Sequence, residues 1–198
     1  MRFLGLLYEA QGSVIKAQEI YLDLIESNPS DSQTIKRLVC LFRDMEMLSS
    51  ALVVLNKYVE VNQEDHEAWL ELSDIYASKG NYSKAIFCIE EVLSANPKNY
   101  LLNLRYAEIL YSSHRQDRIG DLLLARKYFS HAAILKEDEK EPCVRALLGL
   151  VRTCKQISAI AKKGENDDKN KEVLHTAQRQ IKAYYARKGS EKLIKGWE

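Results

Sequence analysis

The fold of this chain is decided by residues 67–97, which read EAWLELSDIYASKGNYSKAIFCIEEVLSANP. In the first half of this stretch, Leu72 and Tyr76 are four residues apart, which places their side chains on one face of an α-helix. Ala85 and Ile89 have the same spacing in the second half. Each half is therefore predicted to form an amphipathic helix, and the two apolar faces are predicted to pack against each other.

The same residue types recur at intervals of 34 residues before this stretch. The recurring columns hold leucine, an aromatic residue, alanine, a large apolar residue and proline: Leu4/Leu38/Leu72, Tyr8/Phe42/Tyr76, Ala17/Ala51/Ala85, Tyr21/Leu55/Ile89 and Pro29/Gln63/Pro97. Only Gln63 departs from type, and Trp69 and Gly80 also fit the tetratricopeptide repeat, which has this period. The sequence therefore predicts an all-α tetratricopeptide α-solenoid, a right-handed superhelix of helix pairs.

Small residues and helix-ending residues fit this arrangement. The alanine column lets paired helices approach closely. Gly12 and Gly80 lie between the helices of a pair, where glycine readily adopts the left-handed conformation that ends a helix. Pro29 and Pro97 follow the second helix of a pair, and proline cannot continue a helix because it lacks the backbone donor. These residues predict where each helix ends.

Three segments are predicted along the chain. Repeats occupy residues 1–161, and the first repeat is expected to be truncated because Met1 falls on the fourth position of the pattern. Residues 162–171, KKGENDDKNK, contain no apolar residue and are predicted to form a charged mobile linker. Residues 172–198 are predicted to form a C-terminal helix and a basic tail, because eleven basic and six acidic residues occur from Lys155 onward.

An insertion is predicted within the fourth repeat. Ala125, Phe129 and Ala132 occur six residues later than the period requires. We assign the extra residues to 112–121, which read SSHRQDRIGD and are mostly polar. This segment is predicted to be a surface loop, and a partner contact is the alternative.

Composition indicates an ordinary globular chain. Of its 198 residues, 46% are apolar, and the net charge is only +1. The apolar stretches are far shorter than the roughly 20 residues that cross a bilayer, and no signal peptide is expected because the first residues fit the repeat. The basic tail fits a solvated surface, a membrane surface or a ribosomal RNA contact. Nucleic acid is nevertheless not expected as a partner, because Glu191 and Glu198 interrupt the basic residues and no aromatic platform accompanies them.

Residue types that carry catalytic or metal chemistry are scattered. The cysteines have no CxxC spacing and are predicted to be reduced, mostly packed thiols, as suits the cytosol: Cys40, Cys88, Cys143 and Cys154. The four histidines are equally dispersed, and no glycine-rich phosphate loop or nucleophile elbow occurs. We therefore expect no catalytic residues, no cofactor, no metal and no small-molecule substrate. An enzyme is the least favoured interpretation.

Partner binding is predicted on the concave surface, which is lined by non-core positions of the first helices. The candidate residues are Gln33, Lys36, Arg37, Cys40 and Arg43 in the second repeat, Glu67, Leu70, Glu71 and Asp74 in the third, and Leu101 and Arg105 in the fourth. Because basic and acidic residues alternate between repeats, an extended or helical partner segment of complementary charge is expected to bind here, and a solvated face is the alternative. Reversing Lys36 and Arg37 is expected to weaken binding with little change in stability.

One known chemistry of such grooves is not expected. Members of this repeat family that bind chaperone tails hold a carboxylate with Lys, Asn, Asn, Lys and Arg. The equivalent positions here are Lys36, Cys40, Glu71, Leu101 and Arg105. Only two of the five match, and Glu71 would repel a carboxylate. A heat-shock co-chaperone is therefore an unfavoured interpretation.

Several short strings exceed what the repeat alone requires. They are Trp69-Leu70-Glu71-Leu72, Phe87-Cys88-Ile89-Glu90-Glu91, Tyr106-Ala107-Glu108, Arg126-Lys127-Tyr128-Phe129 and Arg145-Ala146-Leu147-Leu148-Gly149-Leu150. Through these strings, residues 1–155 resemble the subunit 2 family of the ER membrane protein complex. The resemblance does not extend to residues 162–171, and that family begins with further helices.

The resemblance implies a non-catalytic scaffold subunit of a complex that inserts membrane proteins into the endoplasmic reticulum. Its expected partners are other subunits of that membrane-associated complex. It also implies a peripheral location on the cytoplasmic side of the membrane, with membrane contact made indirectly through partners. The alternative is a free cytosolic tetratricopeptide adaptor that binds a partner peptide in its concave groove.

Overall fold

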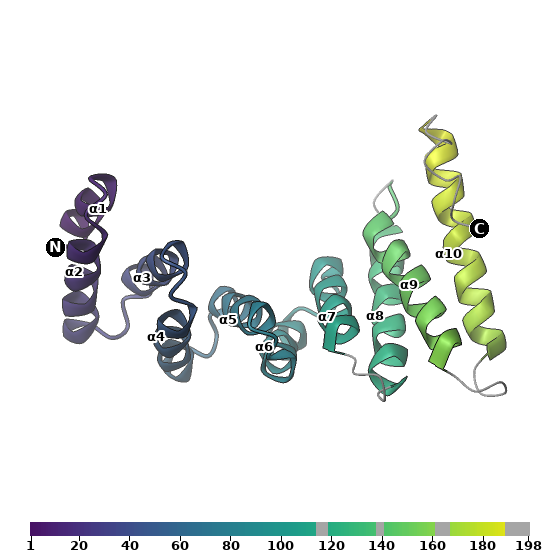
Figure 1. The fold of residues 1–198 in the computed structure, drawn as a ribbon, viewed down its shortest axis with the longest axis horizontal. Coiled ribbons are helices and arrows are strands. Elements are labelled where there is room, and N and C mark those ends of the chain that lie inside the picture. The colour runs from purple at the N-terminus through teal and green to yellow at the C-terminus, as the bar shows by residue number, and fades with distance from the viewer. Residues whose placement is uncertain (114–118, 138–140, 161–166, 189–198) are drawn as a thin grey trace. The chain divides into compact units, whose positions relative to one another are not determined.

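The computed structural model describes residues 1–113, 119–137, 141–160 and 167–188, and all regular structure in these ranges is α-helical (Figure 1). The predicted all-α fold is therefore confirmed. No helix within these ranges is both long and apolar enough to cross a bilayer. Ten helices occur there: α1 (Arg2–Ala10), α2 (Val14–Ser27), α3 (Ser32–Asp44), α4 (Leu48–Val61), α5 (His66–Ser78), α6 (Tyr82–Ala95), α7 (Tyr100–Ser113), α8 (Ile119–Glu137), α9 (Val144–Ile160) and α10 (Asp167–Arg187).

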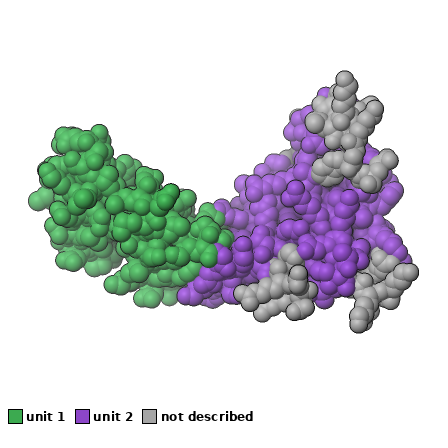
Figure 2. Space-filling view, in the orientation of Figure 1, with its two compact units in different colours: residues 1–79 green, residues 80–198 purple. Residues whose placement is uncertain are grey.

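The chain divides into two compact units, residues 1–79 and residues 80–198 (Figure 2). The first unit contains α1 to α5, and within it α1 packs against α2, α2 against α3, α3 against α4 and α4 against α5. The second unit contains α6 to α10, which also pack in sequence order. Each unit is therefore built from neighbouring helices, as expected when a repeat contacts mainly the adjacent repeats.

The predicted core columns are buried except in α1, where Tyr8 is half-buried and Leu4 is exposed. Fully or almost fully buried members are Ala17, Tyr21, Leu38, Ala51, Leu55 and Leu72 in the first unit and Ala85 and Ile89 in the second. Leu4 is 41% exposed, so its prediction as a core residue is wrong. Its equivalent Leu38 lies on α3, which packs against both α2 and α4, whereas α1 packs against α2. Burial of a column member therefore depends on the helices that pack against it as well as on the repeat pattern.

Two glycines face aromatic rings at close range. A Cβ atom at Gly5 of α1 would overlap the Tyr21 ring of α2. In the second unit, a Cβ atom at Gly149 of α9 would overlap the Phe129 ring of α8. Both rings belong to buried side chains. Glycine is therefore required at these positions by packing rather than by backbone conformation.

Side chains fix the starts of several helices. Asp31 precedes α3 and accepts hydrogen bonds from the backbone N–H groups of Gln33 and Thr34. Asp65 occupies the equivalent place before α5 and accepts one from Ala68. Asn81 precedes α6 and accepts one from the N–H of Lys84. Each carboxylate or amide oxygen thus satisfies backbone donors that have no partner inside the helix.

Three equivalent turn positions adopt the left-handed backbone conformation. Gly12 has φ 74° and Gly80 has φ 72°, as predicted for glycines that end a first helix. Glu46 occupies the same position after α3 and has φ 58°. A residue with a Cβ atom is strained in this region, so the second repeat contains a strained turn that its neighbours avoid.

We expect Glu46→Gly to raise the free energy of unfolding by about 1 kcal/mol, because glycine adopts this backbone conformation without strain. Glu46 is exposed, so the substitution removes little packing. Chemical denaturation measures the change. Gly80→Ala is the matched control and should lower stability, because it adds a Cβ atom at φ 72°. A stability unchanged by Glu46→Gly would show that the turn is not strained.

The predicted insertion loop is shorter in the structure than in the sequence prediction. Helix α7 continues through residues 112 and 113, and α8 begins at Ile119, so residues 119–121 are helical. Residues 114–118 lie outside the described ranges. Polar composition extended the prediction into the helix ends, because exposed helical turns are polar as well.

The predicted charged linker also differs from the structure. Helix α10 begins at Asp167, so residues 167–171 are helical, while residues 162–166 lie outside the described ranges, as do residues 189–198 of the predicted tail. The reason is visible at Asn170, whose side chain is buried. Its amide nitrogen donates to the Cys154 carbonyl at 2.9 Å and to the Ser158 Oγ at 2.8 Å, and its Oδ1 accepts from Arg126 at 2.9 Å. This buried amide joins α8, α9 and α10.

Candidate partner-binding surface

The candidate groove residues of the first unit lie on two helices. Gln33, Lys36, Arg37, Cys40 and Arg43 belong to α3, and Glu67, Leu70, Glu71 and Asp74 belong to α5. On α3 these positions are three or four residues from each other, except for the adjacent pair Lys36 and Arg37. All of them are exposed or half-buried. Leu101 and Arg105 belong to α7 of the second unit. The structure thus brings nine of the eleven candidates together in one unit.

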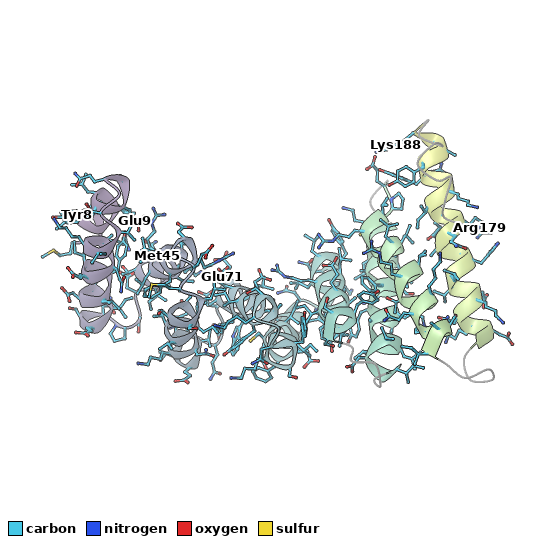
Figure 3. All side chains as sticks on the ribbon, viewed as in Figure 1. Tyr8, Glu9, Met45, Glu71, Arg179 and Lys188 are labelled. Carbon is cyan, nitrogen blue, oxygen red and sulfur yellow. The ribbon has the colours of Figure 1, made fainter. Side chains whose placement is uncertain are left out.

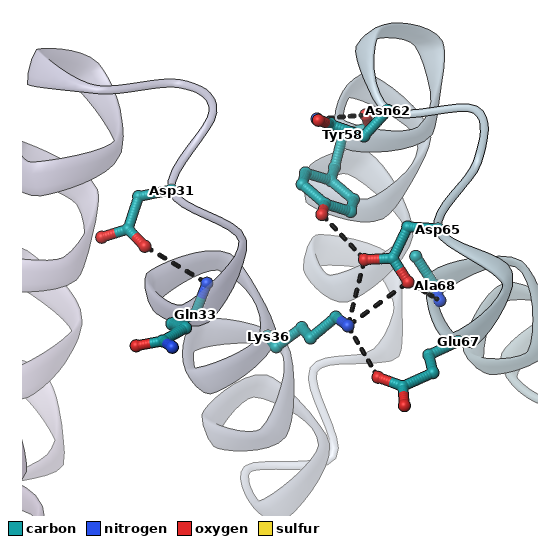
Figure 4. Close-up of polar contacts among 8 residues, drawn as sticks. All are labelled: Asp31, Gln33, Lys36, Tyr58, Asn62, Asp65, Glu67 and Ala68. Carbon is teal, nitrogen blue, oxygen red and sulfur yellow. Dashed lines mark hydrogen bonds and ion pairs between the residues drawn. The ribbon is translucent and has the colours of Figure 1, made fainter.

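Lys36 joins α3 to the start of α5 (Figure 4). Its Nζ lies 3.0 Å from Asp65 Oδ2 and 2.7 Å from Glu67 Oε2. Asp65 also accepts a hydrogen bond of 2.8 Å from the Tyr58 hydroxyl and one of 3.2 Å from the Ala68 N–H. Burial tends to raise the pKa of Asp65, but these donors outweigh it and hold the pKa below its ordinary value. Asp65 is therefore an ionised hub between two repeats.

Arg37 joins α3 to α1. Its Nε and Nη2 atoms lie 2.9 and 2.5 Å from Glu9 Oε2, and Nε lies 3.2 Å from Oε1. Glu9 is labelled on the first unit in Figure 3. Its side chain is only 15% exposed. Burial, and then the Glu9 carboxylate, raise the pKa of the neighbouring Tyr21 to about 12. The pair therefore covers a buried phenol that stays protonated at physiological pH.

A third ion pair joins Arg43 of α3 to Glu71 of α5. All three basic candidates on α3 are therefore paired with carboxylates of the same unit. The expectation that reversing Lys36 and Arg37 leaves stability nearly unchanged is corrected by these pairs, since each reversal would place two carboxylates together. Sequence reasoning placed Glu67 and Glu71 near these bases but missed Glu9 and Asp65.

The second unit has its own connected polar groups. Arg145 of α9 makes a two-point ion pair with Glu108 of α7, with Nε–Oε1 at 2.5 Å and Nη2–Oε2 at 2.8 Å. The Tyr106 hydroxyl donates to Glu90 Oε1 at 2.5 Å, and its ring meets the Tyr128 ring edge-on at 4.5 Å. These five residues all lie in the strings that exceed the repeat pattern. Four of the five strings therefore contribute contacts between helices of this unit.

The cysteines differ in accessibility. Cys40 is exposed on α3, whereas Cys88, Cys143 and Cys154 are buried. Burial raises the pKa of the Cys88 and Cys154 thiols to about 11. In the described ranges, the structure groups no three histidine, cysteine or acidic side chains in a way that could hold a metal ion.

The family model of the EMC2 TPR-like repeat domain matches residues 1–118, which is more than half of the chain. The chain belongs to the EMC2 TPR-like repeat family. The sequence prediction of a tetratricopeptide protein resembling subunit 2 of the ER membrane protein complex is thereby confirmed.

Relatives of this EMC2-family chain carry the name of that subunit. ER membrane protein complex subunit 2-B of Xenopus laevis is 33% identical over 185 residues, which are 93% of this chain and 60% of the relative. Subunit 2-A of the same organism is 35% identical over 149 residues, 75% of this chain and 48% of the relative. Subunit 2 of Dictyostelium discoideum is 38% identical over 100 residues, which are 50% of this chain and 31% of the relative. The EMC2-family chain thus spans about half to three fifths of the two frog relatives.

Solved structures share the fold at low sequence identity. The C-terminal part of a TPR repeat-containing protein from Cytophaga hutchinsonii has a TM-score of 0.69 at 17% identity, covering 92% of the EMC2-family chain and 67% of that structure. A crystal structure of MamA protein has a TM-score of 0.66 at 15% identity, covering 92% of this chain and 90% of that structure. These similarities confirm the tetratricopeptide fold.

Proposed function

We propose that this EMC2-family chain is a non-catalytic scaffold subunit of the ER membrane protein complex. In this role it holds other subunits together on the cytoplasmic side of the endoplasmic reticulum for the insertion of membrane proteins. The observation that carries the proposal is the family match across residues 1–118, together with relatives that are named as subunits of that complex. A repeat fold built from paired helices supports it, because such folds present long binding surfaces.

The partner surface belongs to the same proposal. We assign it to the nine candidate residues on α3 and α5 of the first unit; Leu101 and Arg105 of α7 are proposed as contacts of the second unit by itself. Glu67 is 83% exposed although it pairs with Lys36, so its second oxygen can meet a partner donor. A partner segment would therefore meet side chains that already form ion pairs. This favours a segment that carries both basic and acidic residues.

A charge swap separates partner binding from stability. Arg37→Glu alone should lower the free energy of unfolding by about 1–2 kcal/mol, because it leaves Glu9 against a second carboxylate. The double variant Glu9→Arg/Arg37→Glu restores an ion pair in the opposite order and should recover most of that stability. Thermal unfolding measures both. A matched swap on exposed positions of α4, Lys57→Glu/Glu60→Lys, is the control.

Complex assembly is read from purification out of detergent-solubilised endoplasmic reticulum membranes. The unchanged chain should co-purify with the subunits of a membrane-protein complex. A chain that runs as a free monomer and captures only short peptides would instead favour the cytosolic adaptor. The Glu9/Arg37 swap should lose partners while the α4 swap keeps them. If both swaps retain every partner, the groove assignment is wrong.

The side of the membrane can be tested without altering the chain. Asn81-Tyr82-Ser83 is an acceptor pattern for N-glycosylation, which is added in the lumen, and Asn81 is exposed. We expect the chain from endoplasmic reticulum membranes to show no change in gel migration after glycosidase treatment. The control is the same chain directed into the lumen by an added signal peptide, which should become glycosylated. A glycan on the unchanged chain would contradict the cytoplasmic side.

A further inference from the structure

A cavity of about 260 Å³ lies in the second unit, and none of the residues that line it is a groove candidate. Helix α9 packs against both α8 and α10 (Figure 1). Residues of all three helices line the cavity. The buried residues Cys143, Leu147 and Leu150 line it. Ile134 of α8 and Val173 of α10 also line it. The cavity is therefore an apolar recess bounded by three helices.

The size and exposure of this recess fit a binding site rather than a packing defect. An apolar cavity of about 150 Å³ is enough for a benzene-sized ligand, so the recess has room for one or two large side chains. Ile134 lines it and is still 62% exposed. A large exposed aliphatic side chain beside an open apolar recess favours the docking of another apolar group.

The charge at the edge of the recess restricts what can bind. Among the described residues that line it, Glu172 of α10 carries the one carboxylate, and the other polar side chains are Ser130, Thr176 and Gln180. Glu172 is exposed and makes no ion pair or hydrogen bond to another described residue. A cationic group of a bound segment would therefore find a partner at the edge, whereas an anionic group would be repelled.

We propose that this recess binds a segment of another subunit of the complex. The segment inserts one or two large apolar side chains and places a lysine or arginine, about one helical turn away, beside Glu172. This inference rests on the proposed scaffold function and adds a second contact surface, distinct from the groove on α3 and α5. A scaffold with two such surfaces can hold two partner segments at once.

A photo-crosslinker at position 134 tests the proposal within the intact complex. The full chain carrying benzoyl-phenylalanine in place of Ile134 is expressed in cells, and endoplasmic reticulum membranes are irradiated before purification. We expect a crosslink, mapped by mass spectrometry, to a segment of a co-purifying subunit that contains large apolar residues and a lysine or arginine. The same probe at Val53, which is 58% exposed on α4, is the control for exposure alone and should not reach that segment.

A charge reversal gives the second arm. Glu172→Lys should reduce the yield of that crosslink by about fivefold, because an attraction at the edge becomes a repulsion. Asp168→Lys reverses an exposed charge one helical turn from Glu172, at a residue that does not line the recess, and should change the yield much less than Glu172→Lys does. Thermal midpoints confirm that both variants are folded.

The outcomes separate this inference from the proposed function. If the probe-bearing chain co-purifies with the complex but crosslinks only to lipid, to a second copy of itself or to its own residues 189–198, the recess assignment is overturned and the scaffold function stands. An undiminished crosslink in Glu172→Lys overturns the predicted basic residue. A chain that never co-purifies with the complex overturns both.

Discussion

Replacing Asn170 with alanine should lower the free energy of unfolding of the second unit by about 2–3 kcal/mol, the largest effect that we expect from a single substitution. The Asn170 side chain is buried and satisfies groups on two other helices, the Cys154 carbonyl of α9 and the Arg126 guanidinium of α8. Alanine removes all of these hydrogen bonds at once. The Cys154 carbonyl and the Arg126 guanidinium are partly shielded from water, so hydrogen bonds to water cannot fully replace the ones that are lost.

Hydrogen exchange and thermal unfolding together check this result. Amide protons of α10 should exchange faster in Asn170→Ala than in the unchanged chain, because the start of α10 loses its contacts with α8 and α9. Lys169→Ala, at the exposed neighbouring position, is the control and should change neither measurement appreciably. Equal protection of α10 in both variants would show that apolar packing alone holds this helix.

Gly149→Ala should destabilise the second unit by about 1–3 kcal/mol, although alanine normally favours a helix more than glycine does. The added methyl group would overlap the Phe129 ring, and Phe129 is buried on α8. Either the ring or helix α9 must move, and both lose close packing. The measurement is the midpoint of chemical denaturation.

Gly120 supplies the matched control for this prediction. It also lies in a helix, but a Cβ atom there would meet no other atom within 4 Å. Gly120→Ala should therefore be neutral or stabilising, by up to about 1 kcal/mol. Opposite signs at the two glycines would establish that ring contact controls the result. A stabilising Gly149→Ala would mean that α8 and α9 can separate without cost.

The burial of the core could be predicted from the sequence because the repeat period constrains it. Ala85 and Leu72 are each one member of a column, and a column of like residues reports a shared environment. Asn170 could not be predicted in this way. Pattern analysis treats polar residues as exposed, and only the positions of α8 and α9 reveal that this amide has three partners. The same limit explains the false linker assignment at residues 167–171.

The surface location of the candidate residues on α3 could be predicted from the sequence, but their ion pairs could not. The repeat pattern placed Arg37 and Arg43 at non-core positions of α3, and both side chains are exposed. Glu71 was placed near these basic residues, but Glu9 was missed, although both pairs are separated by 28 residues. A search for opposite charges at slightly less than one repeat length would have found both pairs. Whether this face binds a partner remains the prediction that the charge swap tests.

The different accessibility of the four thiols allows the unmodified chain to be labelled at a single cysteine. Cys40 is exposed at the centre of the candidate surface on α3, while the other three cysteines are buried. The thiols of Cys88 and Cys154, with pKa values raised to about 11, hold almost no thiolate at neutral pH. A maleimide dye should therefore attach at one position without mutagenesis. Its fluorescence would then report in real time on each partner that approaches this face.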